Sequence, residues 1–99
     1  MRVIARSTLK NFYEITLYND SKDPIESWYF EAKRAQWTSW MDVKQKYGNA
    51  SILKNGRVVF NIHGNKYRLI VRINYEAQVI YIRFIGTHKE YDAIDAEEI

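Results

Sequence analysis

The chain contains no cysteine and a single proline, and none of its apolar runs is long. The absence of cysteine excludes a disulfide framework, a thiolate metal site and a cysteine nucleophile, and it is typical of a reducing compartment. A membrane-spanning helix needs about 20 apolar residues, whereas Arg68, Arg72 and Arg83 interrupt the most apolar third of the chain. The opening MRVIARSTLK has Arg6 and Lys10 within its apolar run, which is not the pattern of a signal peptide. We therefore expect a cytoplasmic protein with no membrane partner.

The composition is that of a folded domain with a modest core. Of 99 residues, 46% are hydrophobic and 15% are aromatic, which argues against intrinsic disorder. A chain of this length is close to the usual size of one domain. There is no internal repeat, low-complexity segment or linker, so residues 1–99 are expected to form a single domain.

The net charge of +3 is small, but the charges are unevenly distributed. Residues 54–89 contain seven lysines and arginines against Glu76 alone, and residues 90–99 contain five carboxylates and no basic residue. A basic block of this kind suggests a surface for a polyanion, followed by an acidic segment that either shields this surface or faces a partner. The alternative is that the strands carry arginine on their solvent-facing side for solubility.

The first half of the chain has helical periodicity. Ser7 is a candidate N-cap for a first helix that ends near residues 19–21. Asp23 and Pro24 resemble the N-cap and first position of a second helix, and Ser39 precedes a third, shorter one. All three tryptophans are expected in the core. The apolar positions expected to face it are Leu9, Phe12, Tyr13, Leu17, Ile25, Trp28, Tyr29, Ala32, Trp40, Val43 and Tyr47.

After residue 50 the period changes from helical to two, as in β-strands. Residues 1–5 are a plausible first strand, and RVVFNI, KYRLIVRIN and QVIYIRFIG predict three more, joined by short turns at HGN and NYEA. A further turn is expected at Asn55-Gly56, after SIL. The order is one strand, two or three helices and three strands. It predicts an α+β fold in which the helices pack on one face of an antiparallel β-sheet.

Strand alternation separates an apolar face from a polar one. In the middle strand, Tyr67, Leu69, Val71 and Ile73 point one way. In the last strand we expect Ile80, Ile82 and Phe84 to face the helices, and Val79, Tyr81, Arg83 and Ile85 to face away. Cations interleaved with an aromatic ring suit a phosphodiester backbone with bases stacked nearby. The residues expected on this open face include Arg57, Asn61, Lys66, Arg68, Arg72, Tyr81 and Arg83.

The segment GTHKEYD follows the last predicted strand and contains more than a turn requires. If it continues as a helical turn, His88 and Tyr91 lie on the same side. Cleavage of RNA through the 2′-hydroxyl needs a proton acceptor, cations for the phosphorane charge and a group that helps the leaving oxygen. His88, Tyr91, Lys66, Arg68 and Arg83 supply such groups without a metal. The alternative for His88 is a strand-end histidine that hydrogen-bonds to the backbone.

A metal site at the same segment is the weaker interpretation. On an extended chain His88, Glu90 and Asp92 would point the same way, as ligands do. A dense basic patch repels cations, however, and the only other histidine, His63, lies in a turn. The sequence also has no glycine-rich phosphate loop. We expect no metal and no cofactor.

Three stretches of the chain closely resemble the HigB-type toxins of bacterial toxin–antitoxin systems, which are relatives of RelE. These stretches are MRVIARSTLKNFYE, VVFNIHGNKYRLIVRINY and IYIRFIGTHKEYDAID. The resemblance implies a RelE-like fold and an endoribonuclease (mRNA interferase) that cuts mRNA during translation on the ribosome. It also implies a HigA-like helix-turn-helix antitoxin, which neutralises the toxin and binds operator DNA.

Carried onto this sequence, the resemblance marks five positions as catalytic. These are Lys66 and Arg68 from GNKYR, Arg83 from RFIG, and His88 and Tyr91 from THKEYD. Our hypothesis assigns His88 as the general base or acid, Arg68 and Arg83 as ligands of the scissile phosphate, and Tyr91 as a stacking or orienting group. The residues expected to bind RNA around them are Arg57, Asn61, Arg72, Tyr81 and Lys89.

Two other functions use the same features. A non-catalytic RNA-binding or ribosome-binding module would use the same basic face, with salt-dependent binding and no cleavage products. A protein-interaction domain would instead expose the patch around Val79 and Tyr81 to a partner, which is compatible with binding of an antitoxin.

Overall fold

The computed structural model describes all 99 residues and has one five-stranded sheet, in the order β1-β5-β4-β3-β2. Neighbouring strands are antiparallel except β1, which lies parallel to β5. The predicted α+β class and its mostly antiparallel sheet are confirmed, as are the first strand and the three-strand meander. The strands are β1 (Arg2–Ile4), β2 (Ser51–Ile52), β3 (Arg57–Ile62), β4 (Tyr67–Asn74) and β5 (Val79–Thr87).

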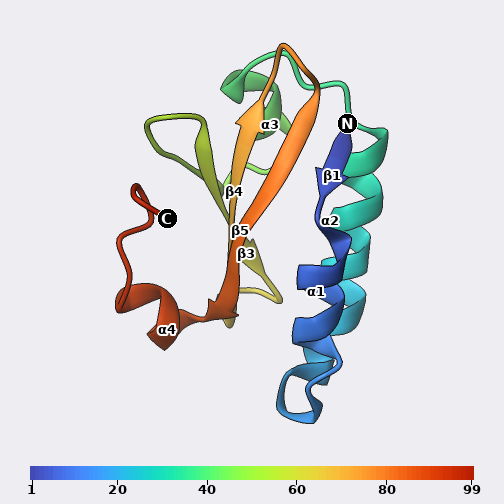
Figure 1. Cartoon of the computed structure of the whole chain (residues 1–99), viewed down its shortest axis with the longest axis vertical. Coiled ribbons are helices and arrows are strands. Elements are labelled where there is room, and N and C mark those ends of the chain that lie inside the picture. The colour runs from blue at the N-terminus through green and yellow to red at the C-terminus, as the bar shows by residue number, and fades with distance from the viewer.

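The long helices cover one face of this sheet, and a short helix lies beyond the other (Figure 1). Helices α1 and α2 run side by side against the sheet, while α4 and the C-terminal segment lie on the opposite side. No helix is long and apolar enough to cross a membrane. The helices are α1 (Arg6–Tyr13), the 3₁₀ helix η1 (Thr16–Ser21), α2 (Lys22–Arg34), α3 (Trp40–Lys46) and α4 (His88–Asp92).

A single cluster of 17 buried residues fills the space between helices and sheet. The predicted apolar side of β4 is confirmed, since Tyr67, Leu69, Val71 and Ile73 all belong to this cluster. Phe60 of β3 lies at its centre, with ring centroids 5.3 Å from Trp28 and 5.1 Å from Tyr47. Burial of large aromatic side chains is the main source of stability for a domain of this size.

The predicted start of the third helix after Ser39 is confirmed, whereas the two earlier helices each begin two residues before the predicted position. Helix α1 begins at Arg6 after Ala5, so Ser7 lies in its first turn and does not cap it. Helix α2 begins at Lys22, because the chain arrives already helical from η1. Asp23 is therefore not the N-cap, although a carboxylate in the first turn still interacts favourably with the helix dipole.

Two residues predicted for the core are exposed. Helix α1 ends at Tyr13, so Leu17 falls in η1, where it is 76% exposed. Trp40 is 50% exposed because α3 begins only at this residue. Trp28 and Trp37 are buried as predicted, and Trp37, in the connection before α3, stacks on Phe60 with centroids 6.4 Å apart.

Ile80 and Ile82 of β5 face the core as predicted, but a β-bulge at Arg83 inverts the predicted alternation for the residues that follow it. Ile70 pairs with Phe84 and Val71 with Ile82, so Arg83 has no partner in β4. An extra residue on one strand exchanges the faces of all residues beyond it. Ile85 therefore packs against the core, and Phe84 shares the opposite face with Ile70, the reverse of the prediction.

The face away from the long helices is not fully open: its centre is buried, and the acidic segment contacts two of its cations, in line with the shielding that the charge distribution suggested. Val59 and Ile70 are 3% and 0% exposed, although they lie outside the cluster under the helices. Residues 93–99 run along this side of the sheet (Figure 1). Arg57 Nε donates to the main-chain oxygen of Ile99 at 2.8 Å, and Lys54 Nζ lies 3.3 Å from a carboxylate oxygen of Glu97.

The difference between the tryptophans gives a direct test of the core. Trp28→Ala is expected to lower the free energy of unfolding by about 3–5 kcal/mol, because it leaves a cavity beside Phe60. Trp40→Ala, at an exposed position, is expected to change it by less than about 0.5 kcal/mol. Urea denaturation of both variants measures the difference. An equal loss in Trp40→Ala would place that side chain in the core.

Candidate functional site

The junction between β5 and α4 is fixed by local hydrogen bonds. Thr87 Oγ1 accepts from the main-chain N–H of Glu90 at 3.1 Å, and the Glu90 carboxylate accepts from the main-chain N–H of Thr87 at 2.9 Å. This is a capping box, and its T-x-x-E spacing was a readable signal in the sequence. At Gly86 a Cβ would lie 2.6 Å from Phe84 Cζ and 3.1 Å from Glu90 Oε1, so a side chain there would displace both.

Helix α4 directs His88 and Tyr91 to the same side, as the sequence predicts. Their rings are 6.4 Å apart and nearly perpendicular. His88 Nδ1 lies 3.0 Å from Asp92 Oδ2, one helical turn away. When Nδ1–H donates to this carboxylate, Nε2 is the nitrogen left for an external group. Asp92 was not predicted as a partner of His88. Its spacing of four residues from His88, which brings two side chains together on a helix, was the available signal.

The end of β4 brings two predicted cations to this helix. The main-chain N–H of His88 donates to the carbonyl oxygen of Lys66 at 3.2 Å, so the two residues lie side by side just beyond the paired ends of β4 and β5. Arg68 Cζ lies 5.7 Å from the centroid of the Tyr91 ring, and its guanidinium donates to Asn65 O at 3.0 Å. The structure thus places four of the five predicted catalytic residues together: Lys66, Arg68, His88 and Tyr91.

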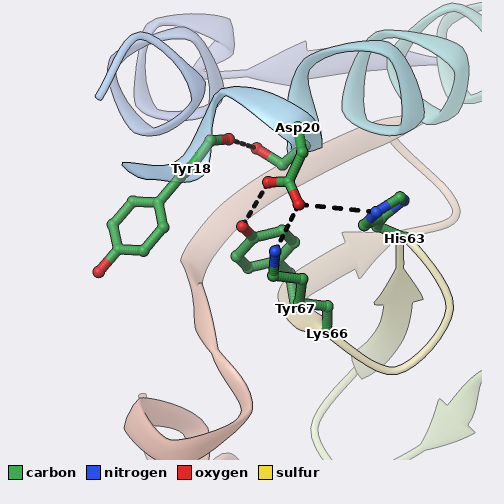
Figure 2. A network of polar contacts seen from close by, with 6 residues as sticks. Tyr18, Asp20, His63, Lys66 and Tyr67 are labelled. Carbon is green, nitrogen blue, oxygen red and sulfur yellow. Dashed lines mark hydrogen bonds and ion pairs between the residues drawn. The ribbon is translucent and has the colours of Figure 1, made fainter. Parts of the chain in front are cut away.

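Asp20 of η1 fixes Lys66 from the other side (Figure 2). Its carboxylate lies 2.5 Å from Lys66 Nζ, accepts from the Tyr67 hydroxyl at 2.6 Å and is 3.6 Å from His63 Nε2. The hydrogen bonds from Lys66 and then Tyr67 hold the pKa of Asp20 below its usual value. No sequence signal pointed to Asp20, which lies 46 residues from Lys66 along the chain.

The same contacts keep Lys66 and Tyr67 protonated. The hydrogen bond to Asp20 raises the pKa of Lys66 above its usual value. Burial, followed by the hydrogen bond to Asp20, raises the pKa of the Tyr67 hydroxyl. Lys66 is therefore a fixed ammonium donor whose charge is shared with a carboxylate.

Arg83 lies apart from this cluster. It lines a separate hollow of about 560 Å³ on the same side of the sheet, together with Arg72 and Tyr81. Across β3 and β4, Arg57 stands directly opposite Arg72, and Asn61 stands opposite Arg68. The predicted site residues thus form two groups, one at each end of the face.

The metal interpretation assumed an extended chain at residues 88–92, and the structure does not have one there. The chain at residues 88–92 is helical, so His88, Glu90 and Asp92 do not point the same way as they would on an extended chain. Glu90 instead caps the helix, and Asp92 pairs with His88.

Comparison with known proteins identifies one family. Residues 21–94 match the model of the HigB toxin family, described as the RelE-like toxic component of a toxin–antitoxin system. The mRNA interferase toxin HigB of Escherichia coli strain K12 is 47% identical over 38 residues. The mRNA interferase HigB of Shigella flexneri matches with the same identity and length. Each match covers 38% of this chain and 36% of the relative, about a third of its length.

The Asp20 contacts predict a pH-dependent contribution to stability. A carboxyl whose pKa is lowered on folding stabilises the fold above its unfolded pKa of about 3.9, and this stabilisation is lost as the pH falls. The contribution of Lys66, whose pKa is raised, is present below about pH 10.5 and lost above it. Asp20→Asn is therefore expected to lower the Tm at pH 7, with the difference from the wild type narrowing below about pH 4.

Thermal unfolding from pH 7 to pH 3 makes this measurement, with Glu76→Gln as the control at an exposed carboxylate. Tyr67→Phe removes one hydrogen bond to the same carboxylate and is expected to cost about 1.5 kcal/mol. A difference between Asp20→Asn and the wild type that stays constant over this pH range would contradict the assignment.

Proposed function

This chain belongs to the HigB family of RelE-like toxic components of toxin–antitoxin systems, and from that membership we propose that it is an endoribonuclease that cleaves mRNA. The observation that carries the proposal is that strand pairing brings Lys66, Arg68 and His88 to one end of the sheet. These groups come from β4 and from the junction of β5 with α4, and main-chain hydrogen bonds hold the two together. They are a proton acceptor, a planar phosphate ligand and an ammonium donor.

The proposed reaction is attack of the ribose 2′-oxygen on the adjacent phosphorus. His88 Nε2 takes the proton of the 2′-hydroxyl while the new O–P bond forms and the bond from phosphorus to the 5′-oxygen breaks. Arg68 stabilises the negative charge of the phosphorane, and Lys66 transfers a proton to the leaving 5′-oxygen, which departs as a hydroxyl. Solvent then returns a proton to Lys66 and takes the one held by His88. The products are a 2′,3′-cyclic phosphate and a 5′-hydroxyl. No metal takes part in this scheme.

Three other side chains support these groups. Asp92 orients the imidazole of His88 through Nδ1, as the carboxylate does in other histidine-dependent sites. Asp20 orients Lys66. Tyr91 lies between His88 and Arg68 and offers its ring to a base or to the guanidinium.

The second group of residues is proposed to bind the RNA backbone away from the scissile bond. Arg57 and Arg72 are directly opposite each other across β3 and β4, an arrangement that destabilises a sheet. An anionic ligand between them would offset this repulsion. We assign Arg83, Arg72 and Tyr81 to the same binding surface, with Asn61 near Arg68 and Lys89 beside His88.

The partners follow from the same proposal. The substrate is mRNA on the translating ribosome, which places the enzyme in the cytoplasm. A cognate HigA-like antitoxin with a helix-turn-helix neutralises the enzyme, and the complex contacts operator DNA through the antitoxin. The ribosome positions the mRNA and completes the site, and the small net charge of +3 gives this chain only modest attraction of its own for RNA.

Cleavage is tested by primer extension on a reporter mRNA, with translating ribosomes and with naked RNA in parallel. His88→Ala is expected to reduce the cleavage rate by about 10²–10⁴-fold, because it removes the proton acceptor. Arg68→Ala is expected to reduce it by about 10²–10³-fold. Arg83→Ala, which lies outside the cluster, is expected to weaken RNA binding more than it slows the chemical step.

Arg34→Ala, at the end of α2, is the matched control and is expected to cleave like the wild type. A 2′-deoxy nucleotide at the cut site is expected to block the reaction. Cuts only on translated message would establish dependence on the ribosome, and cuts in both samples would make the enzyme self-sufficient. Salt-dependent RNA binding with no cuts in either sample would replace the proposal with a non-catalytic binding module.

The acidic C-terminal segment gives a separate prediction. Removing residues 93–99 frees Arg57 and Lys54 from their contacts with Ile99 and Glu97. In a His88→Ala background, this deletion is expected to tighten RNA binding and to steepen its salt dependence, with the slope growing by about one for each freed cation that contacts a phosphate. Glu14→Gln, on the helical side, is the control. Unchanged affinity would rule out shielding by this segment.

A further inference from the structure

A hollow of about 440 Å³ lies between η1 and the junction of β5 with α4. The hollow begins at Lys66 and His88 and reaches towards η1, none of whose residues was predicted to belong to the site. Its walls differ in chemistry, because those contributed by η1 are apolar and aromatic while the others are polar or cationic. The residues that line it are Leu17, Tyr18, Asn65, Lys66, Tyr67, Thr87, His88 and Lys89.

The wall formed by η1 is held rigidly in place. The Tyr18 ring stacks on Phe12 with centroids 4.6 Å apart and planes 3° apart, and meets the edge of Tyr67 at 5.9 Å. Two residues further on, Asp20 binds Lys66 and Tyr67 of the hairpin. Figure 2 shows that the Tyr18 ring points away from these polar contacts. The wall is therefore anchored to α1 and β4 through Tyr18, and to the start of β4 through Asp20.

Leu17 stands at the rim of this hollow and is 76% exposed. A single exposed leucine needs no special explanation. Here, however, it adjoins an aromatic ring on one side of a space whose other side carries Lys66, Lys89 and His88. Lys66 shares its charge with Asp20, whereas Lys89 pairs with no carboxylate and retains its full charge.

This division matches the chemistry of a nucleotide, which is a flat and largely apolar base joined to an anionic phosphate. Bases bind to proteins by packing on aromatic and apolar side chains, and phosphates bind to lysines. An amide from Asn65 and a hydroxyl from Thr87 are available for hydrogen bonds to the base edge or the ribose. An acidic peptide would use the lysines, but it would leave the apolar wall without a ligand.

We propose that this hollow is a nucleotide subsite, in which the base next to the scissile phosphate packs on Leu17 and Tyr18. The inference rests on the proposed function, because the phosphate it places beside His88 is the one that is cleaved. In this arrangement Leu17 and Tyr18 determine which bases are accepted at the cut. They are specificity-determining residues, and neither takes part in the chemical step.

The first experiment measures binding without cleavage. The four nucleoside 3′-monophosphates and inorganic phosphate are titrated separately into the full chain, and NMR chemical shifts of His88 and Leu17 report occupancy. We expect nucleotides to shift both residues, and inorganic phosphate to shift His88 alone. Leu17→Ala is expected to weaken nucleotide binding by about 3–10-fold, as expected for loss of packing against one base, with phosphate binding unchanged.

Two variants complete this test. Leu17→Phe replaces the rim with an aromatic ring and is expected to bind nucleotides at least as tightly as the wild type. Ile15→Ala removes an exposed apolar side chain just before η1 that does not line the hollow, and it is expected to have no effect. Nucleotide affinity that is equal in the wild type and Leu17→Ala would overturn the proposal.

The second experiment separates this proposal from the proposed function. Cut sites on one mRNA are compared for the wild type, Leu17→Ala and Leu17→Phe. A changed distribution of cut sites, with cleavage retained, is the expected result. Cleavage with an unchanged distribution would overturn the subsite and leave the ribonuclease intact. Nucleotide binding that depends on Leu17, with no RNA cleavage by the wild type, would support the subsite and contradict the ribonuclease.

Discussion

The pairing of β4 with β5 is the constraint on which the rest of the structure depends. The terminal residue pair of this ladder is Tyr67 with Thr87. It brings Lys66, which precedes β4, beside His88, which follows β5. The two are 22 positions apart in the sequence, yet a main-chain hydrogen bond connects them. A shift of this register by one residue would have two effects at once: it would expose the apolar side of β4, and it would move Lys66 away from His88. Folding stability and site geometry thus depend on the same ladder of hydrogen bonds.

Sequence patterns predicted those features that depend on local chemistry. The strands of the meander, the Asn55-Gly56 turn and the buried side of β4 follow from alternation and from residues that tolerate positive φ, here 60° and 75°. The placement of His88 and Tyr91 on one side of a helical turn follows from a spacing of three residues. What the patterns missed depends on contacts distant in the chain. The bulge at Arg83 is set by pairing with β4, Trp40 is exposed because of where α3 begins, and Asp20 meets Lys66 only in the folded chain.

The bulge also explains why the predicted site divides into two. A regular β5 would have carried Ile85 on the same side as Tyr81 and Arg83, in line with the junction to α4. The extra residue leaves Arg83 on this side and turns Phe84 onto it, where Phe84 adjoins Ile70 and closes over Gly86. An apolar centre therefore separates the arginine group around Arg72 from the cluster around His88. Residues 93–99 run along the same side of the sheet and hold Arg57 and Lys54, so an RNA strand that used both groups would have to pass this segment or displace it.

The contacts of Asp20 restrict the role that Lys66 can have. A free ammonium group would attract a phosphate by its net charge, but this one is 2.5 Å from a carboxylate. Asp20 cannot leave Lys66 easily, because the same carboxylate accepts the hydrogen bond of the buried Tyr67 hydroxyl, and a buried hydroxyl without a partner is costly. These contacts favour a pair that stays together, in which Lys66 is an N–H donor of fixed direction with little net charge to attract an anion. In the proposed ribonuclease, that attraction would come from Arg68 and Lys89, which pair with no carboxylate, and these two residues would carry the charge available to RNA.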